Sequence, residues 1–348
     1  MTTFSAFDHA MMARALRLAQ KGRYTSAPNP MVGCVITLDN KVIGEGHHQQ
    51  AGTAHAEVNA LSQVDDLLTQ GKLDVDQLKY ATAYVTLEPC SHTGRTGPCA
   101  DALIDRQIGR VVIAMQDPFS EVAGRGIAKL THANIQVEVG LLADESAALN
   151  RHFLSLVERR RPFVTAKLAT SLDGKIALNN GVSQWITGPE ARRDVQGHRA
   201  QHMCILTGSQ TVIADDPQLN VRLDELPDAV QQTLASNPLA HLIQPLRAVV
   251  DSNRQINVGG TTRFDWRAST WRPTSHPRTR RPRPAALITP EMLDPPRVCP
   301  TTSSLSVHTV AGQQDGRHRT CCPLAAPLWL RQGHRFVVQE APRATQLP

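Results

Sequence analysis

Four side chains in the first third of the chain have the types and spacing that metal-dependent hydrolysis requires. His55 and Glu57 stand two residues apart at the start of an expected helix, and Cys90 and Cys99 follow farther along the chain. One imidazole and two thiolates suit zinc, and three protein ligands leave the fourth tetrahedral position open to water. A carboxylate beside such a site can carry protons between that water and a leaving amine. We therefore predict that His55, Cys90 and Cys99 bind one zinc ion and that Glu57 is catalytic.

The order of these residues, H-x-E and then P-C with a further cysteine, is the signature of zinc-dependent nucleobase deaminases. Here Pro89 precedes Cys90, and an expected strand precedes Pro89. A lone histidine or cysteine is usually a packing or capping residue, and we interpret Cys34 and Cys204, inside apolar strands, in that way. The chain departs from the signature in one respect, because eight residues rather than two separate Cys90 from Cys99.

The elements that must position these residues follow an alternating pattern. Short β-type runs alternate with helical stretches, which predicts βαβ units and layered α/β domains. In the first part we expect strands at 33–38, 83–87, 110–115 and 135–139 and helices at 54–63, 99–106 and 126–133; in the second part we expect strands at 163–168, 203–207 and 247–251 and a helix at 189–201. The expected organisation is a first domain at 1–145, a linker at 146–161 and a second domain at 162–262.

The formal charge of +6 comes entirely from the end of the chain. Residues 1–262 hold 24 Lys and Arg against 26 Asp and Glu, a net charge of −2, whereas residues 263–348 hold 13 Arg against 5 acids, a net charge of +8. The segment 263–348 is rich in Arg and Pro and lacks strand or helix periodicity, which predicts a disordered tail.

The seven scattered cysteines do not form the framework of a disulfide-rich secreted domain, and this favours a cytoplasmic location. No stretch of the chain approaches the roughly 20 apolar residues of a membrane span. We therefore expect no membrane partner, and the sequence leaves a homo-oligomer open.

Three stretches of sequence carry a resemblance to one family. They are PCSHTGRTGPC at 89–99, PNPMVG at 28–33 and QDP at 116–118. From about residue 7 to residue 255, the chain resembles the bacterial bifunctional riboflavin-biosynthesis deaminase/reductase. The resemblance implies a three-layer, cytidine-deaminase-like domain that acts on a small-molecule substrate, diaminohydroxyphosphoribosylaminopyrimidine. It implies that Asn29 holds the pyrimidine edge. His92, Arg95 and Thr96 are then candidates for binding the ribose phosphate, since a guanidinium matches phosphate oxygens.

The segments at 167–175 and 183–188 resemble the start of the family's reductase domain. The resemblance implies a dihydrofolate-reductase-like fold in which NADPH reduces the ribosyl chain to a ribityl chain, the cofactor supplying the chemistry. It places NADPH contacts at Ala169, Trp185, Thr211, Asp215 and Ser252 and substrate contacts at Ser183, Arg199, Leu219 and Arg222. The less favoured alternative is that Trp185 is a core residue and that the arginines belong to a solvated surface.

The family's later motifs have no counterpart after Ser252. We therefore expect the reductase domain to be truncated, and we interpret residues from about 262 onward as an out-of-frame reading of the gene.

Two other functions fit parts of the sequence. One is a deaminase of polynucleotides such as tRNA, against which stand the long insert between Cys90 and Cys99 and the net negative charge of residues 1–262. The other is a nucleic-acid-binding protein that uses the Arg-rich tail, which lacks Lys and interleaved aromatic residues. We expect no nucleic-acid partner.

Overall fold

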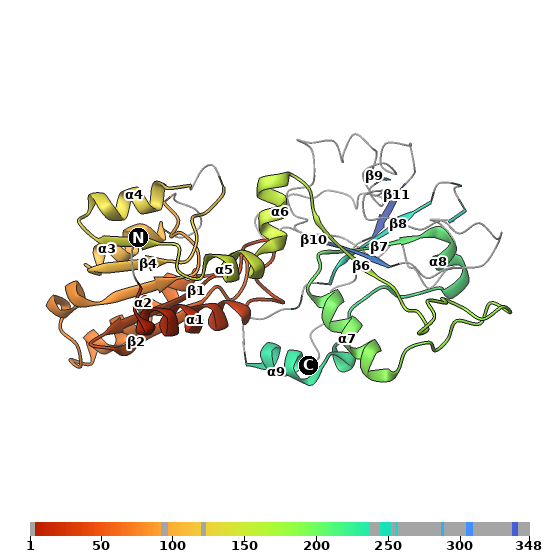
Figure 1. Ribbon diagram of the computed structural model, residues 1–348, viewed down its shortest axis with the longest axis horizontal. Helices are drawn as coiled ribbons and strands as arrows, with labels where there is room; N and C mark the ends of the chain where they lie inside the picture. The colour runs from red at the N-terminus through yellow and green to blue at the C-terminus, as the bar shows by residue number, and fades with distance from the viewer. Residues whose placement is uncertain are drawn as a thin grey trace, which may run out of the picture. The chain divides into compact units, whose positions relative to one another are not determined.

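The computed structural model describes residues 4–91, 97–119, 123–236, 242, 244–251, 253 and 255–256, together with the backbone of strands at 287–288, 304–308 and 336–339. The chain divides into two compact units, of which the first contains Met1–Arg159 and the second begins at Arg160 (Figure 1). Among the described residues, no helix has both the length and the apolar character that a bilayer crossing requires.

The first unit is built on a five-stranded sheet in the order β2-β1-β3-β4-β5. Strand β1 runs antiparallel to β2 and β3, whereas β3, β4 and β5 are parallel. The strands are β1 Gly33–Leu38, β2 Lys41–His47, β3 Thr82–Val85, β4 Arg110–Ile113 and β5 Gln136–Val139. The helices are α1 Ala6–Gln20, α2 Ala56–Thr69, α3 Cys99–Asp105, α4 Arg125–His132, α5 Ala143–Leu149 and α6 Arg151–Arg159, with a 3-10 turn η1 at Val75–Tyr80.

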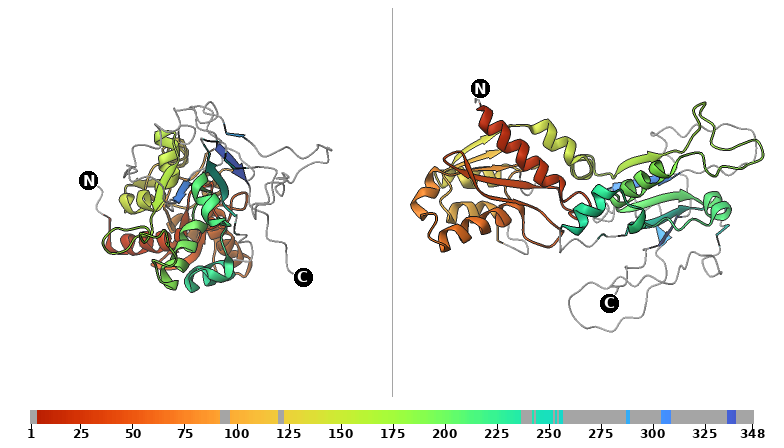
Figure 2. Two further views of the ribbon diagram at one scale, coloured as in Figure 1. Left: turned by 90° about the vertical axis from the view of Figure 1, so that its right-hand side faces the viewer. Right: turned by 90° about the horizontal axis from the view of Figure 1, so that it is seen from below.

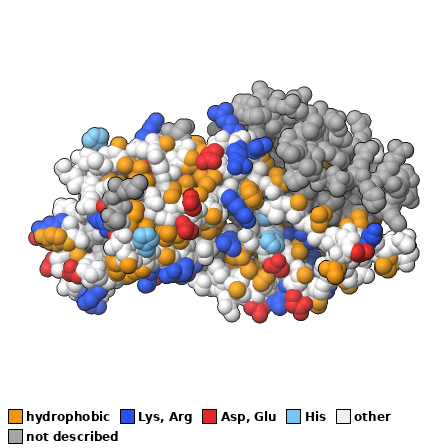
Figure 3. Space-filling view, in the orientation of Figure 1, with side chains coloured by type: hydrophobic (Ala, Val, Ile, Leu, Met, Phe, Trp, Pro, Cys, Tyr) orange, Lys and Arg blue, Asp and Glu red, His pale blue; other side chains and the backbone are white. Residues whose placement is uncertain are grey.

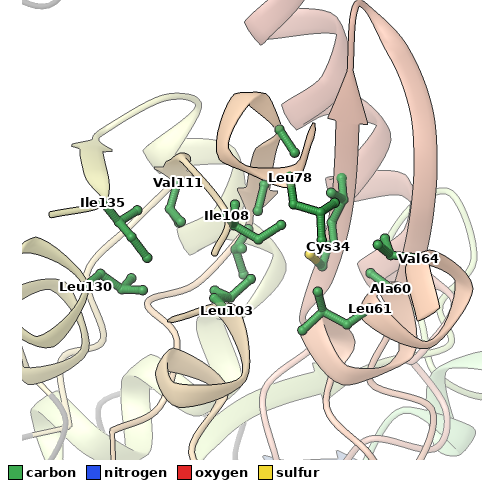
Figure 4. Close-up of a cluster of buried hydrophobic side chains, with 14 of the residues drawn as sticks. Cys34, Ala60, Leu61, Val64, Leu78, Leu103, Ile108, Val111, Leu130 and Ile135 are labelled. Atoms are coloured by element: carbon green, nitrogen blue, oxygen red, sulfur yellow. The ribbon is translucent and has the colours of Figure 1, made fainter. Parts of the chain in front are cut away.

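Both faces of this sheet are covered, because successive residues of a strand point to opposite sides. Cys34 and Ile36 of β1 belong to a buried cluster that includes side chains of α2, α3 and α4 (Figure 4). Val35, between them, packs instead with Met12 and Ala15 of α1. All six residues of β1 are therefore buried, and the three-layer arrangement predicted from the sequence is confirmed.

The expected linker at 146–161 differs from the structure. Helices α5 and α6 occupy most of it, and Ser146 and Asn150 are buried, at 0% and 2% exposed. Both side chains bond to the backbone of the first unit, Ser146 Oγ to Thr86 O at 2.6 Å and Asn150 Oδ1 to Met31 N at 2.8 Å. The segment is polar and charged, which is typical of a linker. Two of its side chains nevertheless hold it to the first unit.

The second unit contains a six-stranded sheet in the order β6-β10-β7-β8-β11-β9. Strands β6, β10, β7 and β8 are parallel, and β11 runs antiparallel to β8 and β9; the strands can be followed in Figure 2. The strands are β6 Phe163–Lys167, β7 Cys204–Gly208, β8 Leu246–Val250, β9 Leu287–Ile288, β10 Ser304–His308 and β11 Phe336–Gln339. The helices after Arg160 are α7 Pro189–Ala200, α8 Ser209–Asp215 and α9 Asp228–Ala235, with a 3-10 turn η2 at Leu223–Glu225.

Strands β9, β10 and β11 come from the segment in which the sequence indicated no strand. They have two, five and four residues, and runs this short give little periodicity to detect. The other residues of 263–348 lie outside those described. The expectation of disorder for them therefore stays a prediction.

Candidate active site

The predicted metal ligands come together from three separate elements of the first unit. His55 immediately precedes α2, Cys99 is the first residue of α3, and Cys90 lies in the loop between β3 and α3. The Nδ1 atom of His55 lies 3.2 Å from Cys99 Sγ and 3.6 Å from Cys90 Sγ. Within the described part of the chain, this group of three has its ligand atoms within 4.8 Å of one another.

The geometry fits a tetrahedral zinc ion. With Zn–N near 2.0 Å and Zn–S near 2.3 Å, a tetrahedral angle separates nitrogen from sulfur by about 3.5 Å, close to both Nδ1–Sγ distances. His55 is the N-cap residue of α2, but its side chain makes no capping hydrogen bond. The capping interpretation therefore fails here, and the imidazole remains available as a ligand.

The electrostatics of the two cysteines also suit a metal. The backbone N–H of Cys99 donates to Cys90 Sγ at 3.3 Å. Hydrogen bonding from the Cys99 side chain, and then from His55, lowers the pKa of Cys90 to about 4, whereas the neighbouring Cys90 raises the pKa of Cys99. The hydrogen bond with Cys90 raises the pKa of His55. One sulfur is thus stabilised as the thiolate that binds metals.

Glu57 is placed beside this cluster, in the first turn of α2, and is 3% exposed. Its Oε2 atom is buried and has no hydrogen-bond partner among the described residues. Burial, and then the charge of Cys90, raises the pKa of Glu57 to about 7. A carboxyl group that titrates near neutrality suits general acid–base chemistry.

Asn29 is connected to the metal-ligand cluster through His48, a residue that the sequence did not indicate. Its Nδ2 atom lies 3.0 Å from Nε2 of His48, and Nδ1 of His48 lies 3.1 Å from Ala54 O. The rings of His48 and His55 meet edge to face, with centroids 5.4 Å apart. Burial lowers the pKa of His48. Within the His-His pair at 47–48 nothing in the sequence marks the second residue, because its partners lie 19 and 6 residues away.

Glu88 is a second residue that the sequence analysis did not single out, and it fixes the segment that carries Cys90. It is 4% exposed, and its carboxylate accepts four backbone N–H groups. Oε2 accepts from Asp117 at 3.2 Å and Gly124 at 3.0 Å, and Oε1 accepts from Gly126 at 2.9 Å and Ile127 at 3.2 Å. The carboxylate therefore satisfies the free N–H groups at the start of α4.

The close approach of α4 to this segment requires glycine at position 126. A Cβ atom there would lie 2.0 Å from Pro89 O. The sequence offers one indication of the role of Glu88, its position directly before Pro89-Cys90. It does not indicate the hydrogen-bond partners, which lie 29 to 39 residues away.

The insert residues predicted to bind phosphate, His92, Arg95 and Thr96, lie outside the described residues.

In the second unit, the structure brings three of the four predicted substrate contacts close together. Arg199 Nη1 donates to Asn220 O at 3.0 Å, next to Leu219, which is buried. Burial, and then the charge of Arg222, lowers the pKa of Arg199 to about 10. Arg222 also pairs with Glu225 at 2.6 Å. Arg199 is half-buried, with its Nε atom buried, and a partly desolvated guanidinium beside a second one suits an anionic ligand.

The predicted NADPH contacts are spread over several segments. Thr211 and Asp215 lie on α8, Thr211 being buried, and burial raises the pKa of Asp215. Trp185 is 70% exposed, with the Arg192 guanidinium 4.4 Å from its ring centroid, so it is not a core residue. The other predicted NADPH contacts are Ala169, which is half-buried, and Ser252, which lies outside the described residues. Ser183, the fourth predicted substrate contact, is half-buried.

Comparisons with known proteins agree with this architecture. Residues 5–115 match the family described as cytidine and deoxycytidylate deaminase zinc-binding region, and residues 162–275 match the RibD C-terminal domain. The riboflavin biosynthesis protein RibD of Escherichia coli is 52% identical over 249 residues, which cover 72% of this chain and 64% of that protein. The RibD of Haemophilus influenzae is 47% identical over 256 residues, covering 74% and 65%. The chain thus spans less than two thirds of the length of these curated relatives.

Solved structures are similar over more of the chain. Form 2 of Acinetobacter baumannii RibD is 31% identical, with a TM-score of 0.69, covering 96% of this chain and 99% of that one. The Thermotoga maritima diaminohydroxyphosphoribosylaminopyrimidine deaminase/reductase is 30% identical, with a TM-score of 0.67, covering 87% and 81%.

The fold, the ligand set and the two family matches define a protein of the cytidine deaminase class that carries a second, reductase-type domain. Within that class, the chain belongs to the RibD family of riboflavin biosynthesis deaminase/reductases, and the resemblance seen in the sequence is confirmed.

Proposed function

We propose that the first unit deaminates a phosphoribosylaminopyrimidine by zinc-dependent hydrolysis. The observation that carries this proposal is the group His55, Cys90 and Cys99, with the buried Oε2 of Glu57 beside it. His55 Nδ1 and the two sulfurs would hold one zinc ion. When bound, zinc supplies a water activated near neutral pH.

Residues around the zinc site would have three further roles: proton transfer, substrate binding and support of the ligands. Glu57, buried at the edge of the cluster, would hold a proton at Oε2 and pass it to the departing amine. Asn29 would bind the edge of the pyrimidine. The thiolate of Cys90 would be fixed by the N–H of Cys99 and by the anchoring of Glu88 in the preceding segment.

A polynucleotide substrate is not favoured. Residues 1–262 carry a net charge of −2, and on the face shown in Figure 3 acidic and basic side chains of the described residues are interspersed rather than gathered into one basic patch. Binding to a phosphate backbone depends on such a concentration of positive charge.

The deaminase proposal is tested with zinc-loaded full-length chain and diaminohydroxyphosphoribosylaminopyrimidine, with ammonia release as the readout. Glu57→Gln should keep zinc bound and lower kcat by at least about a hundredfold, since it removes the proton carrier. Cys90→Ser should lower the zinc content itself. Wild-type turnover of a tRNA substrate in place of the pyrimidine, or full activity of Glu57→Gln, would contradict the proposal.

We propose that the second unit takes NADPH and the phosphoribosyl side chain, with Arg199 and Arg222 toward the anionic part of the substrate. The same assay with NADPH tests this. Oxidation of NADPH that depends on the deaminated product supports a working reductase. Deamination without NADPH oxidation would contradict this second proposal and leave the first intact.

A further inference from the structure

The side-chain amide of Asn29 is linked to the backbone carbonyl of Ala54 through one residue, His48. The side chain of His48 is 3% exposed. Its Nδ1 lies 3.1 Å from Ala54 O, and its Nε2 lies 3.0 Å from Asn29 Nδ2. The ring of His48 also packs edge to face on His55. His48 therefore lies between Asn29 and a predicted zinc ligand.

The chemistry of these atoms fixes the direction of both hydrogen bonds. A carbonyl oxygen only accepts, so Nδ1 of His48 must carry the hydrogen. An amide nitrogen only donates, so Nε2 must be the unprotonated acceptor of the Asn29 N–H. The amide of an asparagine can usually be turned by 180° without a change of shape. Here the Nδ1–H form of His48 selects the orientation with Nδ2 toward His48.

The backbone beside Asn29 is held independently. Asn150 is 2% exposed, and its amide hydrogen-bonds to both backbone groups of Met31. It accepts from the N–H at 2.8 Å and donates to the carbonyl at 2.9 Å. The N–H of Asn29 donates to Ser26 O at 2.9 Å. With backbone and amide both fixed, Oδ1 of Asn29 is the polar atom of this side chain left for a ligand, and no hydrogen bond to it is found among the described residues.

We propose that His48 is a positioning residue that makes Asn29 present a hydrogen-bond acceptor, Oδ1, to the substrate. The site would then select a pyrimidine that offers an N–H or amino donor at that edge and would disfavour one that offers a carbonyl there. This inference rests on the proposed deaminase function and specifies which chemical edge of the substrate that site recognises.

A double-mutant cycle tests the proposal in the zinc-loaded full-length chain. In the wild-type background, His48→Ala should lower kcat/KM for ammonia release by about tenfold or more, because a misplaced binding group weakens the reactive geometry. In the Asn29→Ala background, the same change should cost less than about twofold. Equal losses in the two backgrounds would overturn the proposal, since His48 would then act without Asn29.

Two further variants separate positioning from folding. His48→Gln offers an acceptor in place of Nε2 and should recover part of the activity that His48→Ala loses. His47→Gln is the matched control, because the neighbouring half-buried ring has no assigned role, and it should stay within about twofold of wild type. Zinc content, measured for every variant, should remain unchanged. Loss of zinc in His48→Gln, or no recovery with zinc retained, would count against positioning.

A measurement that needs no turnover decides the same point. In zinc-loaded chain labelled with ¹⁵N at its 14 histidines, the signal that disappears in His48→Gln belongs to His48. The expected form has Nδ1 protonated and Nε2 bare, and a ring protonated at Nε2 would refute the proposal. If the wild type fails to deaminate the pyrimidine, the proposed function fails, while this result still decides the orientation of Asn29.

Discussion

Replacing Glu88 with Gln keeps the shape of the side chain and removes half of its hydrogen bonds. Each carboxylate oxygen accepts two backbone N–H groups, from Asp117 and Gly124 at one oxygen and from Gly126 and Ile127 at the other. The glutamine amide can serve one of these pairs through its oxygen, and its NH2 group must then face two donors. Two buried N–H groups lose their partner at about 1–3 kcal/mol each, so the first unit should be destabilised by about 2–6 kcal/mol.

Urea denaturation, followed through zinc release to a coloured chelator, reports on the first unit. A loss of this size is a large part of the roughly 5–15 kcal/mol that stabilises a typical domain. The zinc-release midpoint should therefore fall clearly, and amide exchange in α4 should accelerate. Glu145→Gln makes the same chemical change at an exposed position in the first turn of α5 and should change the midpoint little. The reasoning is refuted if Glu88→Gln stays within about 1 kcal/mol of wild type or if Glu145→Gln is equally damaging.

Two further substitutions test contacts that stabilise the first unit and the loop carrying Asn29. Burial alone would raise the pKa of Asp8, but hydrogen bonds from Arg110, Ser5 and Tyr84 hold it below its usual range. A depressed carboxyl pKa contributes stability that is present above its ordinary value and is lost as the pH falls through the native value. Asp8→Asn should therefore cost about 2 kcal/mol near neutral pH and progressively less toward about pH 3 in urea titrations, and a pH-independent cost would contradict this. Asn150→Ala should lower kcat/KM for ammonia release by about tenfold with zinc retained, because it frees the backbone next to Asn29; an unchanged kcat/KM would show that the Met31 contacts do not matter.

The parts of the site that the sequence predicted are those in which chemistry restricts the residue type. His55, Glu57, Cys90 and Cys99 could be predicted because zinc accepts few ligand types and because the order of these residues is that of a known signature, although eight residues rather than two separate the cysteines. The strand that places Val35 on one face and Ile36 on the other could be predicted from its continuous apolar run, which is typical of a strand covered on both sides.

The residues that hold the site could not be found in this way. Glu88 and Asn150 bind backbone groups, and His48 binds one at Ala54 O as well as the side chain of Asn29; any residue type supplies a backbone N–H or carbonyl. Their partners are therefore invisible in the sequence until the fold brings them together: Asn150 and Met31 are 119 residues apart. The strands after residue 262 were missed for a different reason, because segments of two to five residues are defined by pairing with neighbours rather than by their own pattern.

The hydrogen bonds of Ser146 and Asn150 decide where the first unit must end. Ser146 ties α5 to Thr86 O, directly after β3, and the side-chain hydroxyl of Thr86 accepts the N–H of Gly33 at the start of β1. Asn150 then holds the backbone beside Asn29. A boundary drawn at residue 145 would remove both contacts while leaving every sheet strand of the unit intact. The segment expected to be a linker is therefore part of the scaffold that holds the loop carrying Asn29, and the first unit extends through α6 to Arg159.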